Sequence, residues 1–203
     1  MNPLPPLRPK MWWDLSMQLA TTDAANELLT TDPLALLTGM LLDQQIPMEK
    51  AFTSPQVLAE RMGVQRLDAH EIASFDPEAF EQLFRRVPAL HRFPAAMAKR
   101  VQELCRAVVQ RYDGQTERIW TEATTGRELV DRVAALPGFG ELKAKIFAAL
   151  LAKQFGVQPT GWQEATGIFG VPDTFRSAAD VVDGESLQKV RAYKKEQKAA
   201  AKQ

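Results

Sequence analysis

Cysteine and histidine are scarce in this chain, and their scarcity argues against most metal chemistry. Of 203 residues, one is cysteine, Cys105, and two are histidines, His70 and His91. A single thiol cannot build a disulfide framework, a thiolate zinc site or a four-cysteine iron–sulfur cluster. Two imidazoles argue against a histidine-rich metal site. Cys105 lies in the helical pattern VQELCRAVV and is expected to be a core residue.

The chain also lacks a long apolar run and an excess of charge of one sign. No stretch reaches the roughly 20 apolar residues that a bilayer-spanning helix needs, and the start, MNPLPPLRPK, has no apolar signal core. We therefore expect a cytoplasmic protein. Lys and Arg number 25, and Asp and Glu number 25. Bulk charge thus gives no argument for polyanion binding, although a local basic face stays open.

The spacing of apolar residues predicts an all-α protein. Residues 1–10 hold four prolines and are expected to form an extended arm, followed by a single two-lobed domain over residues 11–203. Apolar residues recur every three or four positions, and no segment alternates like a strand, so we predict about nine to eleven helices. Three pairs each place a capping residue before a proline and predict a helix start: Asp32-Pro33, Ser54-Pro55 and Asp76-Pro77.

Two features break the helical pattern. Residues 156–184 are rich in Gly, Pro and Thr and predict a long connection with one short helix, before a final helix from Ser186. Basic residues gather in two segments: seven lie between Arg85 and Arg111 against Glu103 alone, and six lie over residues 189–202 against one glutamate. A solvated helix face is the favoured explanation of each segment, and a basic surface is the alternative.

A glycine pair marks the most informative segment, Leu136-Pro137-Gly138-Phe139-Gly140, which lies between two helical patterns. Glycine adopts positive φ and has no Cβ, so this pair allows a tight turn that a ligand can approach closely. Gly140 leaves the first N–H groups of the helix expected over residues 141–154 without side-chain partners, which favours binding of phosphate. Lys143 and Lys145 follow within the first turn and a half. An ordinary helix–turn–helix corner is the alternative.

LPGFG, with Ala144 four positions after its second glycine, resembles the helix-hairpin-helix motif of DNA-binding proteins. Upstream, LLDQQ at residues 41–45 resembles the LLSxQ segment of endonuclease III-like DNA glycosylases. The helix 97–112, followed by Gly114 and then the hairpin, repeats the order of that family. The resemblance covers residues 32–169, and the chain is identified as a member of the helix-hairpin-helix (HhH-GPD) superfamily of base-excision glycosylases. It implies an all-α, two-lobed helical bundle of that type.

Two departures from the family pattern bear on chemistry. Bifunctional members carry a lysine two residues after the second glycine, whose amine attacks the sugar C1′. Leu142 stands there, and Lys143 lies about 100° further around the helix, so lyase activity is not expected. The family's loop aspartate is also missing. Matching Pro159-Thr160 to the family's loop places Glu164 in its position, although a surface role for Glu164 is equally open, and Asp173 is a second candidate.

The resemblance implies that double-stranded DNA containing a damaged base is the partner. Such a protein bends the duplex and extrudes one base, which costs a few kcal/mol. The amides of Gly138 and Gly140, with Lys143 and Lys145, are expected to bind phosphates and to position the DNA without reading sequence. Gln45 is expected to fill the gap left by the extruded base.

The resemblance also implies a monofunctional DNA glycosylase, which hydrolyses the N-glycosidic bond and leaves an abasic site. Glu164 is expected to support the attack of water, with Trp162 and Phe169 stacking on the base or shielding the carboxylate. Backbone carbonyls of Leu136 and Phe139, whose side chain is expected to anchor the turn in the core, would hold the family's monovalent cation. No other cofactor and no iron–sulfur cluster is expected, and a monomer suffices.

Two other classes stay open. A non-catalytic DNA-binding protein would keep the hairpin, and the missing aspartate and lysine favour it. An all-helical adaptor would use the basic tail to bind another protein. For His91, which precedes an expected helix start, a phosphate contact, a capping role and a surface position are all consistent with the sequence.

Overall fold

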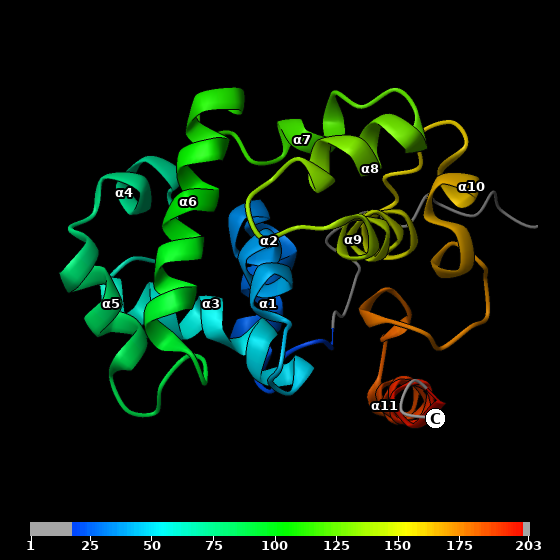
Figure 1. The fold of residues 1–203 in the computed structure, drawn as a ribbon, viewed down its shortest axis with the longest axis horizontal. Coiled ribbons are helices and arrows are strands. Elements are labelled where there is room, and N and C mark those ends of the chain that lie inside the picture. The colour runs from blue at the N-terminus through cyan, green and yellow to red at the C-terminus, as the bar shows by residue number, and fades with distance from the viewer. Residues whose placement is uncertain (1–17, 201–203) are drawn as a thin grey trace, which may run out of the picture.

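Helices account for the whole architecture of the described part of the chain, residues 18–200 of a computed structural model (Figure 1). This part holds eleven α-helices, two 3₁₀ helices and no β-strand. The predicted all-α class is therefore confirmed, and the number of helices lies within the predicted range. The arm predicted for residues 1–10 and the domain start at residue 11 lie outside the described residues.

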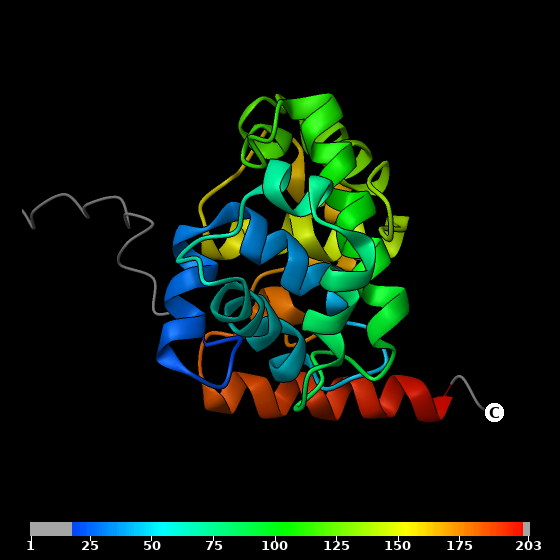
Figure 2. The ribbon, with the colours of Figure 1, turned by 90° about the vertical axis from the view of Figure 1, so that its left-hand side faces the viewer.

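Two sets of helices form the molecule, and within each set the helices pack against one another. The first set comprises α1 (Asp23–Thr31), α2 (Pro33–Leu42), α3 (Met48–Met62), α4 (Ala69–Ser74), α5 (Pro77–Arg85) and α6 (Pro94–Tyr112). The second comprises α7 (Arg118–Thr121), α8 (Gly126–Ala134), α9 (Glu141–Gln154), α10 (Trp162–Thr166), η2 (Gly167–Phe169), η3 (Ala178–Asp180) and α11 (Gly184–Ala200). Figure 2 shows α11 running along one edge of the molecule. None of these helices is both long enough and apolar enough to cross a membrane.

Helix α2 is a member of the first set whose end contacts the second set, and its sequence explains why it is buried. PLALLTGMLL is apolar on every side, which is the pattern of a helix surrounded by protein. All of its residues from Leu34 to Leu42 are buried. Asp32 caps it as predicted, because one carboxylate oxygen accepts the N–H groups of Leu34 and Ala35 at 2.9 and 3.1 Å. The other oxygen accepts from Leu67 N at 2.7 Å, which ties the cap to the loop before α4.

The predicted starts at Asp32-Pro33 and Asp76-Pro77 are confirmed, but the one at Ser54-Pro55 is wrong. Pro55 lies inside α3, which begins at Met48. The hydroxyl of Ser54 does not cap a helix. It donates to the carbonyls of Lys50 and Leu90 at 2.8 and 3.0 Å. Burial of the α3 face that carries Ser54 and Pro55 outweighs the backbone hydrogen bond that proline removes.

The connection over residues 156–184 is more ordered than predicted. It contains α10, η2 and η3 in place of one short helix. Ser177 and Asp180 close a reciprocal capping box at η3, and Lys153 of α9 pairs with Asp180 at 2.5 Å. The final helix starts at Gly184, two residues before the predicted position. Side-chain caps therefore hold this segment against α9 without a continuous helical period.

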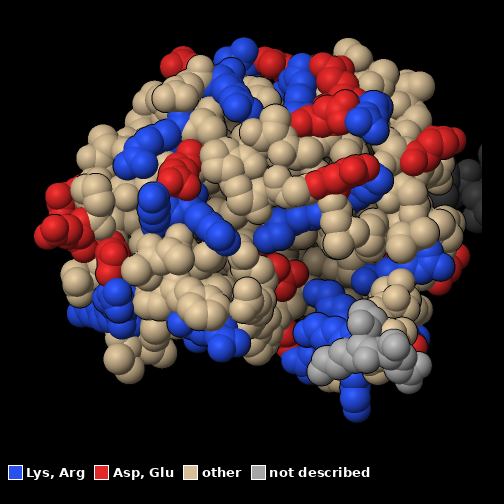
Figure 3. All heavy atoms as spheres, viewed as in Figure 1, with Lys and Arg blue, Asp and Glu red and all other residues tan. Residues whose placement is uncertain are grey.

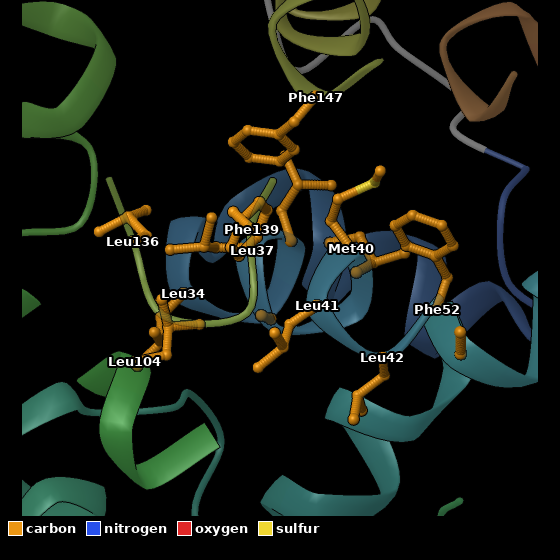
Figure 4. Close-up of a cluster of buried hydrophobic side chains, with 14 of the residues drawn as sticks. Leu34, Leu37, Met40, Leu41, Leu42, Phe52, Leu104, Leu136, Phe139 and Phe147 are labelled. Atoms are coloured by element: carbon orange, nitrogen blue, oxygen red, sulfur yellow. The ribbon is translucent and has the colours of Figure 1, made fainter. Parts of the chain in front are cut away.

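The hairpin between α8 and α9 belongs to the second set of helices and packs on α2 of the first (Figure 4). Gly138 has a φ of 82°, and a Cβ on it would come within 2.3 Å of Leu41 Cδ1 on α2. Phe139 is 7% exposed, and its ring packs edge-on against Phe147 with the centroids 6.2 Å apart. The predicted anchoring of Phe139 in the core is thus confirmed. The absence of a side chain at Gly138 is what lets the turn lie directly on the end of α2.

Candidate nucleic-acid interface

The first turn of α9 is the part of the candidate interface that was predicted to bind phosphate. Gly140 is the N-cap residue, with φ −102° and ψ 174°, and no side chain caps the helix. A helix start without a side-chain cap leaves backbone N–H groups for an external acceptor, and the helix dipole favours negative charge there. Gly140 is exposed, and nothing lies within 4 Å of the position that a Cβ would take. Gly138 has the positive φ predicted for the glycine pair, but Gly140 does not; Gly140 precedes the helix start as predicted, and the binding of phosphate by both stays a prediction.

The two lysines of α9 have different surroundings. Lys145 forms an ion pair with Glu141 at 2.7 Å on the surface of the first turn. The side chain of Lys143 turns inward, and its Nζ donates to the carbonyl oxygen of Leu41 at 2.9 Å and lies 5.8 Å from the Phe139 ring centroid. Burial lowers the pKa of Lys143 to about 8, although the nearby Asp43 acts in the opposite direction. Lys143 therefore joins the hairpin to the end of α2.

The turn after α2 contains two glutamines: Gln44 is fixed by hydrogen bonds, and Gln45 is exposed to solvent. Gln44 is fixed at three points: its Nε2 donates to Leu41 O at 2.8 Å, its Oε1 accepts from Arg100 at 3.0 Å, and its carbonyl accepts from His91 Nε2 at 2.9 Å. Gln45 is exposed and has a φ of 57°, a conformation that L-residues adopt rarely. Such a conformation persists where neighbouring contacts determine it, and it directs Gln45 outward from a rigid base.

His91 is a buried support of this turn. Its side chain is 1% exposed, which excludes the surface position and the direct phosphate contact considered for it. Its Nδ1 accepts the N–H of Phe93, the N-cap residue of α6, at 3.1 Å, so Nε2 carries the proton that Gln44 accepts. Burial lowers the pKa of His91, consistent with this neutral form.

Phe93 is a candidate contact that the sequence analysis did not identify. It is 43% exposed, and the guanidinium carbon of Arg92 lies 4.8 Å from its ring centroid. Exposed aromatic side chains beside basic residues can stack on bases or insert between them. The available signal was an aromatic residue between Arg92 and a helix-starting proline, within the basic segment.

A cavity of about 520 Å³ separates the turn after α2 from α11. One wall comes from residues 43–49 and the other from residues 190–198 of α11. Lys194 pairs with Asp43 at 3.5 Å, and Arg191 pairs with Glu49. Figure 3 shows basic side chains above and below a recess next to α11, with acidic atoms between them. The neutral chain thus gathers basic groups on this face.

Glu164 and the predicted base-pocket aromatics lie elsewhere. The N–H of Gly126, the first residue of α8, donates to Thr160 O at 2.8 Å, and a Cβ on Gly126 would meet Trp162 Cα at 2.3 Å. Helix α10 therefore begins at the opposite end of α8 from the hairpin, about 13 Å along the helix axis. Glu164 is exposed on α10, and Phe169 is a buried core residue. The structure does not bring these residues together with the hairpin.

The predicted cation ligands, the backbone carbonyls of Leu136 and Phe139, are oxygen donors suited to an alkali cation, but two are too few to complete its coordination shell. Leu136 O accepts the N–H of Phe139 at 3.1 Å within the turn. Both carbonyls are hard oxygen donors of the kind that bind alkali cations, and other oxygens would have to complete the shell. Within residues 18–200, no group of three or more His, Cys, Asp or Glu side chains could hold a metal ion.

The comparison with protein families bears directly on this geometry. A family model described as the HhH-GPD superfamily of base excision DNA repair proteins matches residues 38–203. The chain belongs to this superfamily. The matched range covers the Gln44–Gln45 turn, the hairpin and α11, so the HhH-GPD fold extends beyond the region of the sequence resemblance. Comparison with curated proteins and with solved structures gave no match for this HhH-GPD protein.

Proposed function

We propose that this HhH-GPD protein binds duplex DNA that contains a damaged or mismatched base and removes that base by hydrolysis of its N-glycosidic bond. The observation that carries the proposal is the side-by-side position of an uncapped helix start and the outward-directed Gln45. The first would bind a backbone phosphate, and the second would enter the duplex. Because both pack on the end of α2, one bound duplex can engage both.

Positive charges around these two elements support the same orientation of the DNA. Arg100 contacts Gln44, Arg92 covers Phe93, and Lys194 lies across the cavity on α11. Contacts of this kind position a duplex without reading its sequence. Gln45 and Phe93 would then occupy the space of unstacked bases.

The chemistry is expected to stop at the abasic site. Leu142 occupies the position of the lysine of bifunctional members and is 65% exposed, so no amine stands there to form a Schiff base. Water is then the nucleophile, and a carboxylate must assist it. The sequence predicts Glu164 for this role. Because Glu164 lies away from the hairpin, the variant Glu164→Gln is needed to test whether it assists the water.

The test incubates the protein with duplexes that each carry one lesion: uracil, an alkylated purine, an oxidised purine, an oxidised pyrimidine or a mismatch. A strand break that appears only after hot alkali supports a monofunctional glycosylase and identifies its base. A break without alkali would contradict the reading of Leu142. Gln45→Ala should reduce cleavage, whereas Gln82→Ala, an exposed glutamine on α5, should not.

A non-catalytic DNA-binding protein is the second candidate, favoured by Leu142 and by the position of Glu164. It predicts no cleavage of any duplex but binding that weakens steeply with salt. Binding that ignores salt would contradict both candidates and favour an adaptor.

A further inference from the structure

Asp43 is the carboxylate of the turn after α2, and basic residues of three other helices, α6, α9 and α11, surround this turn. Asp43 follows the last residue of α2 and its side chain is 13% exposed. Lys194 of α11 lies 3.5 Å from its Oδ2. The charges of Asp43, of Lys194 and of Arg100 on α6 all act on Lys143 of α9, so Lys143 lies within electrostatic reach of each of them.

Asp43 also lies where a reacting sugar would have to be. It is two residues from Gln45, and an extruded nucleotide remains attached to the phosphates that flank the gap Gln45 would fill. The sugar of that nucleotide is therefore confined to the vicinity of the turn after α2. The cavity of about 520 Å³ opens from Asp43 toward α11 and has the size of a small-molecule site. Glu49, the other acid of this cavity, lies in the first turn of α3, four residues from Gln45, and is paired with Arg191.

We propose that Asp43 is the catalytic carboxylate and that the cavity between it and α11 receives the extruded base. This inference rests on the proposed glycosylase function. The C1′–N bond breaks, and its electron pair leaves with the base, which takes a proton from solvent. The Asp43 carboxylate faces the developing positive charge on the sugar and accepts a proton from the water whose oxygen bonds to C1′. The products are the free base and an abasic sugar.

The sequence departs from the family at this same residue. The segment resembling LLSxQ reads LLDQQ here, so an acid stands where the pattern has serine. No aspartate stands at the family's position in the loop after α9, and Glu164, which is matched to that position, lies at the far end of α8. A carboxylate at Asp43 supplies the missing negative charge from the opposite wall of the site.

The test uses two duplexes that need no knowledge of the natural lesion. One carries a pyrrolidine abasic analogue, which is cationic and mimics the charged sugar, and the other carries neutral tetrahydrofuran. The wild-type protein should bind the cationic duplex about 10- to 100-fold more tightly, as expected for a charge-assisted contact. Asp43→Asn should remove this preference but leave binding of the neutral duplex unchanged. Glu164→Gln, the matched control, should keep it.

Cleavage assays on the lesion panel separate the outcomes. Asp43→Asn should lower turnover about 100-fold or more, in the range of a general base. If the wild type cleaves a lesion and Asp43→Asn cleaves it equally well, Asp43 is overturned and the glycosylase function stands. Loss of the cation preference in Glu164→Gln alone would assign Glu164 instead. A wild type with neither cleavage nor preference overturns both proposals.

Two further measurements keep the result interpretable. Thermal unfolding of Asp43→Asn should match the wild type closely, because asparagine keeps the shape of the side chain and the ion pair that it removes is long, 3.5 Å, with a partly exposed partner, Lys194. Lys194→Gln removes the partner and keeps the acid, so it should retain the cation preference. Loss of the preference in Lys194→Gln as well as in Asp43→Asn would show that the ion pair merely orders α11, and would overturn the assignment. A cation preference that depends on Asp43, without cleavage of the panel, supports the assignment and directs the search to other lesions.

Discussion

Substitution of Gly138 by alanine tests whether the hairpin is fixed by its contact with α2. Gly138 has a φ of 82°, which costs an L-residue about 1–2 kcal/mol. The new Cβ would lie 2.3 Å from Leu41 Cδ1, and Leu41 is fully buried. Overpacking of this kind costs about 1–3 kcal/mol. We therefore expect Gly138→Ala to lower the free energy of unfolding by about 2–5 kcal/mol, or the melting temperature by roughly 4–20 °C.

Gly140→Ala is the matched control in urea unfolding. Gly140 has φ −102°, and nothing lies within 4 Å of its Cβ position, so the cost should be about 1 kcal/mol or less. In a Leu41→Ala background the steric part of the Gly138→Ala cost should vanish and leave about 1–2 kcal/mol from φ. Equal destabilisation by both glycine variants, or an unchanged cost of Gly138→Ala without Leu41, would refute the reasoning.

Three further predictions concern a cap, a histidine and the last helix. Asp32→Ala should cost about 3 kcal/mol, because it leaves three N–H groups without their acceptor, whereas Asp76→Ala removes one exposed cap bond and should cost about 1 kcal/mol in the same urea assay. Burial lowers the pKa of His91 in the folded state, so the unfolded chain binds the proton more readily. Stability should fall as pH drops below about 6.5, and His91→Gln should flatten that loss; parallel pH profiles would contradict it. Replacing Lys194 and Lys195 by glutamine should reduce the slope of log affinity for DNA against log salt by about 0.9 each; an unchanged slope would place α11 away from the phosphates.

Local chemistry made much of the fold predictable. At Asp32 and Asp76 an acid before proline both supplies the cap and occupies a position where no N–H is needed, so the local signal and the structure agree. Ser54-Pro55 carries the same signal, yet the chain is already helical from Met48. Tertiary packing decides that case, and a single sequence does not display it.

In the candidate interface too, some features were predictable from local sequence and others depend on long-range packing. The hairpin is local, so its glycines and the anchoring of Phe139 were predictable from five adjacent residues. The direction of Lys143 was not, because its acceptor, Leu41 O, lies 102 residues away in the chain. The cavity at Asp43 requires α11 to pack across the turn after α2, and no short-range pattern encodes that approach.

The burial of α2 has a consequence for how damage would be selected. The turn that carries Gln45 continues directly from a helix enclosed on all sides, so its backbone cannot yield without disturbing the core. Under the proposed function, a Gln45 held this rigidly would not change its position to fit the duplex. The DNA would then have to deform, and Gln45 would enter the duplex mainly at base pairs that open at low free-energy cost. Damaged base pairs would thus be distinguished from intact ones first by how easily they open, before any group in the cavity contacts the base.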